Sequence, residues 1–155
     1  MSNNGNGDAH ATVVAMIQGV QNSIVKLQGQ MDELSRAVGA SVPLLEAMSR
    51  LNATRSNIVK EAVEQVFKLS KGQTDLPSRR EHIVWPRQVA MYIMRERLKM
   101  TLESIGAAYG GKDHGTVMHA CALVKGRIEN NPRNRAEVET AERVLDIAFR
   151  EKGIQ

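Results

Sequence analysis

The sequence predicts an all-α protein in which an N-terminal coiled-coil-like helix precedes a helix-turn-helix bundle. Apolar residues between positions 13 and 38 recur in steps of three and four, which is the spacing of a coiled coil. Several later segments show the 3.6-residue period of amphipathic helices, and none shows the alternation of a strand. We expect three parts: a disordered tip at 1–9, a helical oligomerisation arm at 10–52, and the bundle at 54–155.

The arm carries an unbroken heptad repeat. Its a sites are Ile17, Ile24, Met31 and Val38, and its d sites are Val13, Val20, Leu27 and Leu34. Mainly β-branched a sites favour a parallel dimer, so we expect a homodimer or a higher homo-oligomer. The flanking e and g sites are uncharged, which leaves open the alternative of an amphipathic helix packed on its own domain.

Breaks in the apolar pattern divide the first seventy residues into three predicted helices. Gly39 is expected to end the long helix, because glycine is common just past a helix C-terminus. The segment "ASVP" then separates it from a short apolar helix at about 44–51. A third helix begins at Asn57 and extends to about Ser70, where apolar residues again recur at helical spacing.

A basic loop is predicted next. The segment "SKGQTDLPSRREHIVW" lacks a helical period and contains Gly72 and Pro77, which are typical of loops. Pro86 suits the first turn of the following helix, because its missing N–H costs nothing there. That helix is expected to extend to about Leu98, and Thr101 to cap a short helix at 102–109.

The stretch "GAAYGGKDHG" at 106–115 has two incompatible interpretations. Gly106, Gly111 and Lys112 match G-x-x-x-x-G-K, the start of a phosphate-binding loop. Such a loop follows a strand and continues with Ser or Thr, whereas here a helix precedes it and Asp113 follows the lysine. The alternative is the turn of a helix-turn-helix motif, in which two helices are joined by about four residues including glycine. We therefore favour the helix-turn-helix.

The second helix of that motif is predicted to begin at an Asp113 cap and to reach Ile128. One stripe, predicted to face the core, holds Val117, Cys121, Val124 and Ile128. The opposite stripe holds Gly115, His119, Ala122 and Gly126. Small residues on an exposed stripe let a helix backbone approach base edges in the major groove. The alternative is that the small residues permit tight packing against another helix.

A final helix is predicted after "NNP" at 130–132. Asn134, with Glu137 three residues later, resembles a capping box that opens this helix. The helix is expected to end near Gly153.

The net charge of +4 is concentrated in the middle of the chain. Residues 54–131 carry thirteen basic and eight acidic side chains, whereas residues 1–53 carry three and four. Residues 132–155 carry five of each. A localised positive field of this kind indicates a polyanionic partner.

Composition predicts a cytoplasmic protein. The single Cys121 excludes an internal disulfide and fits a reducing compartment. No apolar run approaches the roughly 18 residues that span a membrane, and the start "MSNNGNGDAH" lacks the basic residues of a signal peptide.

The segment "RQVAMYIMRERLKMTLESIGAAYGGKDHGTVMHA" resembles the C-terminal DNA-binding domain, domain IV, of the bacterial replication initiator DnaA. The family pattern there is approximately G-G-[RK]-D-H-[ST]-T-V-x-H-A, following R-Q-[IV]-A-M-Y. The similarity extends from about Ile58 to Phe149, some three-fifths of the chain. The large ATPase domain of the family has no counterpart in this sequence, so we expect the DNA-binding domain without it.

This resemblance implies sequence-specific binding of double-stranded DNA at DnaA-box-like sites, and therefore a nucleoid-associated protein. It makes Asp113, His114, Thr116 and His119 candidates for base contacts, and Gly115 belongs to the same DNA-binding site. It places Lys112 near a phosphate or the groove edge. It places Arg79, or its neighbour Arg80, in the minor groove. It places Arg87, Gln88, Arg95 and Leu102 where the family contacts the DNA backbone.

Three residues depart from the family pattern. Gly115 replaces Thr or Ser and removes a methyl and a hydroxyl group that could touch a thymine. Glu103 stands at a position that is often Pro, and Trp85 at one that is frequently Arg. Each departure could retune recognition of the standard site.

We expect a non-enzymatic regulator of transcription or replication initiation, with no cofactor, metal or small-molecule substrate and no membrane association. His114 and His119 are five residues apart and so do not share a helix face as metal ligands would. Two alternatives stay open. One is a protein-interaction module of the replication machinery that has lost DNA specificity, which Gly115 favours. The other is a protein that coats DNA independently of sequence.

Overall fold

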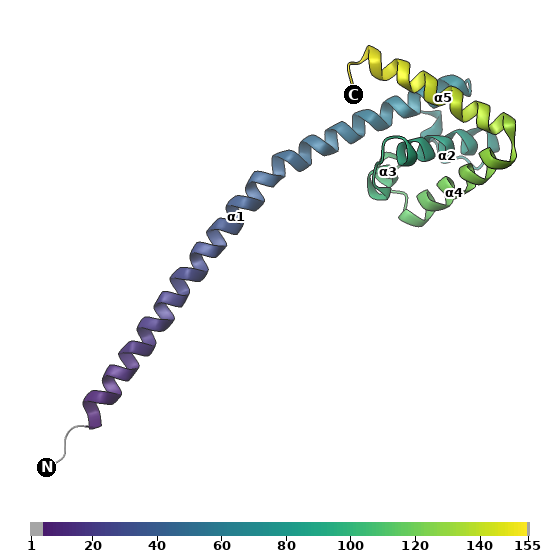
Figure 1. The fold of residues 1–155 in the computed structure, drawn as a ribbon. Coiled ribbons are helices and arrows are strands. Elements are labelled where there is room, and N and C mark those ends of the chain that lie inside the picture. The colour runs from purple at the N-terminus through teal and green to yellow at the C-terminus, as the bar shows by residue number, and fades with distance from the viewer. Residues whose placement is uncertain (1–4, 155) are drawn as a thin grey trace. The chain divides into compact units, whose positions relative to one another are not determined.

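A computed structural model describes residues 5–154, and the remainder of the predicted tip, residues 1–4, lies outside the described part. Within residues 5–154 the chain forms helices and no strand, which confirms the predicted all-α class. The elements are α1 (Gly5–Val66), η1 (Gln73–Asp75), α2 (Glu81–Glu96), α3 (Leu102–Ala108), α4 (His114–Asn130) and α5 (Pro132–Glu151) (Figure 1).

The chain divides into two units, Met1–Ala47 and Met48–Gln155, and α1 contributes residues to both. In the first unit the described residues are helical throughout, including positions 5–9 that we expected to be disordered. Every a and d side chain of the heptad repeat is exposed in this single chain: Val13, Ile17, Val20, Ile24, Leu27, Met31, Leu34 and Val38.

The predicted division of the first seventy residues into three helices is wrong. α1 continues through Gly39 and contains Pro43 within it. A proline inside a helix removes one backbone hydrogen bond, and its ring crowds the carbonyl four residues earlier, here that of Gly39. The segment "LLEAMSRL" after the proline consists mainly of good helix formers, which favour continuation of the helix.

α1 ends at Val66, four residues before the expected end, because the backbone reverses at Lys68. Lys68 adopts a left-handed conformation with φ 55°. The Leu69 N–H then donates to the Glu64 carbonyl at 2.8 Å, and the Lys68 N–H donates to the Gln65 carbonyl at 3.3 Å. These bonds satisfy terminal carbonyls of the helix in the manner of a left-handed C-terminal cap.

α2 begins at Glu81 rather than at Pro86, so the predicted loop is too long at its C-terminal end. Arg80 precedes the helix with extended backbone angles, φ −69° and ψ 131°. Pro86 is the sixth helical residue, where it removes a single hydrogen bond. Burial of Ile83 and Trp85, which the first turns direct into the core, offsets that loss.

The second unit is a helical bundle around one core in which α2 packs chiefly against α4, and α4 also packs against α3 and α5. The C-terminal part of α1 belongs to this unit and contributes an apolar face to the core. The buried core residues are Ile58, Val59, Ala62, Val63, Trp85, Val89, Ala90, Met91, Ile93, Met94, Met100, Ile105, Tyr109, Val117, Ala120, Val124, Val138, Ala141 and Leu145.

A single residue, Asn131, joins α4 to α5. Its side-chain oxygen accepts from the N–H groups of Arg133 at 2.9 Å and Asn134 at 3.4 Å, and Pro132 occupies the first helical position. The predicted cap at Asn134 is therefore wrong by three residues. Its supposed partner Glu137 instead accepts from the Trp85 indole at 2.9 Å.

Candidate nucleic-acid interface

The turn between α3 and α4 folds back onto Gly106. The Gly106 carbonyl accepts from the N–H groups of Gly111 at 2.9 Å and Lys112 at 3.0 Å. A Cβ placed on Gly106 would lie 2.1 Å from the Lys112 carbonyl oxygen, so no larger residue fits this close approach. Gly110 and Gly111 have φ angles of 72° and 79°, which glycine adopts without strain. The element before the turn is the helix α3, as the helix-turn-helix interpretation requires.

Asp113 caps α4 as predicted. The Thr116 N–H donates to Asp113 Oδ1 at 2.6 Å, and the Asp113 backbone is extended, with φ −69° and ψ 161°. This bond from Thr116 is the main reason that the pKa of the Asp113 carboxyl lies below its usual range, and the adjacent His114 lowers it further. The carboxylate is thus ionised and partly engaged in capping, which limits the bonds it could make to a base.

α4 presents the predicted small-residue stripe to solvent. Gly115, His119 and Ala122 are exposed, and Gly126 is half-buried. A Cβ on Gly126 would meet nothing within 4 Å, and one on Gly115 would meet only Asp113 Oδ1 at 3.3 Å. Within the described chain, no helix packs against these glycines. The tight-packing alternative therefore finds no support here.

The core side of α4 also agrees with the prediction, with one addition. Val117 and Val124 are fully buried, whereas Cys121 and Ile128 are half-buried. Burial raises the pKa of the Cys121 thiol, consistent with a packing role. Ala120, which the sequence pattern did not select, is buried three residues after Val117.

A hollow of about 440 Å³ lies between α2 and the N-terminal half of α4. Its lining residues are Val84, Arg87, Gln88, Met91, Lys112, Gly115, Thr116, His119 and Ala120. Six of the predicted site residues thus meet at one surface: Arg87, Gln88, Lys112, Gly115, Thr116 and His119. The lining carries two cations and no carboxylate, so this part of the surface favours an anionic ligand.

Arg87 holds the basic loop that precedes α2. Its guanidinium donates to the carbonyls of Thr74 at 2.7 Å and Ser78 at 3.4 Å, and also to that of Leu76. Arg79 and Arg80, at the C-terminal end of this loop, are exposed. Among the described residues, neither guanidinium has a hydrogen-bond or ion-pair partner.

Arg95 and Leu102 do not line the hollow. The Arg95 guanidinium donates to the Met100 carbonyl at 2.9 Å, across the connection from α2 to α3. Leu102 is the half-buried first residue of α3, and Glu103 beside it is exposed. The structure therefore separates these two predicted backbone contacts from the six site residues that line the hollow.

Trp85 is a core residue rather than a surface substitution for arginine. It is 7% exposed, its indole N–H donates to Glu137 Oε2, and the Arg127 guanidinium lies 4.9 Å from its ring centroid. Arg127 also pairs with Glu81 at the start of α2. This departure from the family pattern thus joins α2, α4 and α5, a role that spacing could not have revealed.

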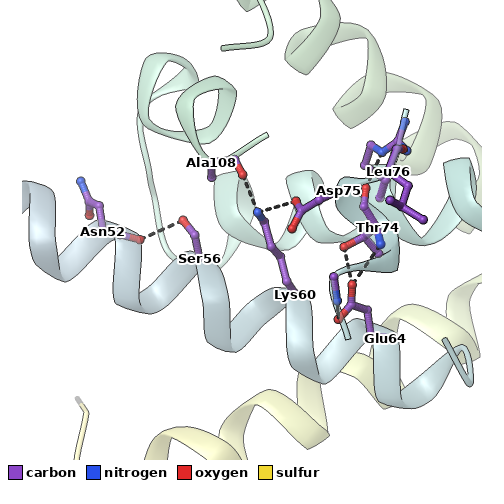
Figure 2. Close-up of polar contacts among 10 residues, drawn as sticks. Asn52, Ser56, Lys60, Glu64, Thr74, Asp75, Leu76 and Ala108 are labelled. Carbon is purple, nitrogen blue, oxygen red and sulfur yellow. Dashed lines mark hydrogen bonds and ion pairs between the residues drawn. The ribbon is translucent and has the colours of Figure 1, made fainter. Parts of the chain in front are cut away.

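Sequence reasoning also missed two buried charged residues on α1, Lys60 and Glu64. Figure 2 shows both side chains extending from α1 toward the loop that contains Thr74 and Asp75. They are 9% and 3% exposed. The available signal was their position between Val59 and Val63 on a face that is otherwise apolar. A charged pair four residues apart on a buried face indicates specific partners, because buried charges require them.

No group of three His, Cys, Asp or Glu side chains in the described part of the chain is placed to hold a metal ion. None of the helices in residues 5–154 combines the length and the apolar character needed to cross a bilayer.

The comparisons with known proteins agree with this geometry. A family model described as the bacterial DnaA protein helix-turn-helix matches residues 56–124, which include α2, α3 and most of α4. Residues 56–124 belong to the DnaA helix-turn-helix family. This DnaA-type domain contains the turn, the hollow and the basic loop described above.

Curated relatives are chromosomal replication initiator proteins DnaA. That of Chloroflexus aurantiacus is 35% identical over 131 residues, covering 77% of this chain and 27% of that protein. The Thermomicrobium roseum protein is 32% identical over 131 residues, with 77% and 28% covered. The Porphyromonas gingivalis protein is 36% identical over 87 residues, with 56% and 18% covered. The chain thus spans less than a third of the length of these relatives.

Proposed function

We propose that this chain binds double-stranded DNA sequence-specifically at DnaA-box-like sites and regulates transcription or replication initiation without catalysing a reaction. The observation that carries the proposal is the exposed start of α4 beside the hollow. There Gly115, Thr116 and His119 share one surface with Arg87 and Lys112. The start of a second helix exposed in this way is the part of a helix-turn-helix motif that meets base edges.

The contacts within this interface divide by chemistry. The Thr116 hydroxyl and the imidazoles of His114 and His119 can donate or accept hydrogen bonds with base edges, and Gly115 lets the α4 backbone approach closely. Lys112 at the rim would meet a phosphate, as would the two N–H groups of Arg87 that are not bound to the loop. Asp113 contributes chiefly by capping α4.

Arg79 is the proposed minor-groove residue, with Arg80 beside it. Both guanidiniums are exposed, and Arg87 fixes the loop that leads to them. Arginine is favoured in narrow minor grooves because the negative potential there is enhanced. Gln88 at the hollow, and Arg95 with Leu102 beyond it, are proposed contacts to the DNA backbone.

The proposed partner of the exposed heptad face is a second copy of this chain. Counted from the a site Ile17, the residues that disfavour helices all occupy the outer positions b, c and f: Gly19, Gly29, Gly39 and Pro43. The charged residues from Lys26 to Glu46 also fall at b, c or f. From Val13 to Val38 the a and d sites therefore form an uninterrupted apolar seam, which a second identical helix would bury. Each dimer would carry two DNA-binding domains.

A gel shift with box-containing and scrambled duplexes at fixed salt tests the DNA-binding proposal. We expect preferential binding to the box. His119→Ala should weaken box binding by about 1–3 kcal/mol and scrambled binding little. His10→Ala, which changes an exposed histidine in the first unit, is the matched control and should leave both unchanged.

Other outcomes contradict this proposal in distinct ways. Equal losses on every duplex would remove the base-contacting role and indicate DNA coating that is independent of sequence. Absence of a shift on any duplex would favour a protein-interaction module.

A further inference from the structure

The segment before Arg79 is held by hydrogen bonds to a buried carboxylate and to an arginine. Glu64 Oε2 accepts from the Gly72 N–H at 3.0 Å. Glu64 Oε1 accepts from the Thr74 N–H at 3.0 Å and from the Thr74 hydroxyl at 2.8 Å. The Arg87 guanidinium donates to the Thr74 carbonyl at 2.7 Å. Both backbone polar groups of Thr74 are therefore fixed by charged side chains.

Lys60, one turn before Glu64, contacts the same segment and also the end of α3. Its ammonium group donates to Asp75 Oδ1 at 2.6 Å and to the Ala108 carbonyl (Figure 2). The same group lies 4.4 Å from the Tyr109 ring centroid. Ala108 and Tyr109 lead directly into the turn before α4. One buried cation thus joins the loop that precedes Arg79 to the turn that precedes Asp113.

Burying Lys60 and Glu64 costs desolvation free energy, which apolar side chains at these two core positions would not. A lysine and a glutamate at 9% and 3% exposure have lost most of their hydration, which hydrogen bonds must replace. Apolar residues at these two positions would extend the core formed by Val59 and Val63. The bonds that Lys60 and Glu64 make instead are all with the two segments that carry the proposed DNA contacts.

We propose that Lys60 and Glu64 are positioning residues that set where Arg79 lies relative to the recognition helix α4. The inference rests on the proposed function above, because it concerns how minor-groove and major-groove contacts are coordinated. Neither residue touches DNA in this scheme. Each acts through the backbone of residues 72–78 or through the end of α3.

The decisive test is a double-mutant cycle between Glu64→Gln and Arg79→Ala in the full chain. The Gln amide would face an N–H group where a carboxylate oxygen now accepts one, so it should release the loop. In the wild type, Arg79→Ala should lower box affinity about tenfold. In the Glu64→Gln background it should lower affinity less than about threefold, because residues that act through one another are not additive. A purely structural role would leave the two effects independent.

Glu61→Gln is the matched control. Glu61 lies on the same helix one turn from Glu64, but its partner is Lys71 in an exposed ion pair at 2.7 Å. This variant should leave the Arg79→Ala effect at its wild-type size. Amide hydrogen exchange of the free protein supplies a second measurement. Exchange at Gly72 and Thr74 should accelerate in Glu64→Gln and in Lys60→Met but not in Glu61→Gln.

The outcomes separate the two proposals. Site preference with a strong Arg79→Ala effect of equal size in both backgrounds would overturn the positioning role alone. Absence of site preference in the wild type would overturn the proposed function and this inference with it. Should Glu64→Gln fail to fold, Thr74→Val takes its place in the cycle, because it removes one donor to the carboxylate and keeps Glu64.

Discussion

At the scale of single residues, Gly106 is the position where the helix-turn-helix turn tolerates least change. Its missing side chain lets the Lys112 carbonyl approach to a distance that any Cβ would obstruct. Gly106→Ala should therefore destabilise the fold by about 1–3 kcal/mol, as overpacking of backbone against side chain does. The measurement is the free energy of unfolding from urea titration. The spacing that resembles a phosphate-binding loop is thus explained by packing.

Gly126→Ala is the contrasting substitution on α4. A Cβ there meets nothing within 4 Å, so the change should stabilise the helix by up to about 1 kcal/mol. If the two alanine variants had the same stability, the close approach at Gly106 would not be what fixes the turn.

The Asp113 cap should make the stability of the start of α4 depend on pH in the acid range. Its pKa is lowered in the folded state by the Thr116 N–H, so its capping contribution is fully present above the unfolded pKa, about 3.9. That contribution is lost as the pH falls from there through the lower folded pKa. Asp113→Asn removes the titration and keeps an acceptor oxygen. The wild type should lose more stability than Asp113→Asn between pH 5 and pH 3, measured by thermal unfolding. Identical losses would contradict the capping assignment.

The sequence predicted which residues are exposed better than it predicted which residues contact one another. The exposure of Gly115 and His119 followed from helical period alone, because both lie opposite the buried Val117 and Val124. The roles of Trp85 and Lys60 did not, because their partners Glu137 and Asp75 are brought near only by the tertiary fold. Helical period identifies the face of a helix on which a residue lies, but not the residues that contact that face.

At the scale of elements, two substitutions in α1 test whether the heptad seam pairs copies of the chain. Leu27 is a d residue, 59% exposed, and Val25 is an outward b residue, 67% exposed. Leu27→Asp should abolish self-association, because a charge at a seam position would have to be buried. Val25→Asp places the same charge on the same helix and should leave association unchanged. Sedimentation equilibrium measures both. Equal behaviour of the two variants, or a monomeric wild type, would contradict the proposed seam.

Element boundaries were the least predictable part of the fold. Gly39 and Pro43 indicated a break that α1 does not make, whereas Lys68 ends the helix without any residue type that signals it. The presence of helices was predicted more reliably than the residues at which they begin and end. The short α3 and the start of α4 were predicted within one residue, because Thr101 and Asp113 cap them with side-chain hydrogen bonds. Capping residues mark a start locally, and tertiary contacts decide the rest.

At the scale of the whole molecule, the charge distribution predicts a marked dependence of binding on salt. The excess of basic residues lies in 54–131, the same region that contains the hollow and the basic loop. If about four to six phosphates are neutralised, the logarithm of affinity should fall with the logarithm of salt at a slope of about −4 to −5. Lys112→Ala should reduce that slope by about 1 on box and scrambled duplexes alike. A slope near zero would exclude the proposed phosphate contacts.

Selection of bound duplexes from a random pool tests most directly whether α4 recognises base sequence. The proposal predicts one enriched box-like motif, with paired motifs at fixed spacing if two copies are joined through α1. The His119→Ala protein should enrich a motif that is degenerate at one or two positions, with the others unchanged. A pool that stays random after repeated rounds with the wild-type chain would contradict the account.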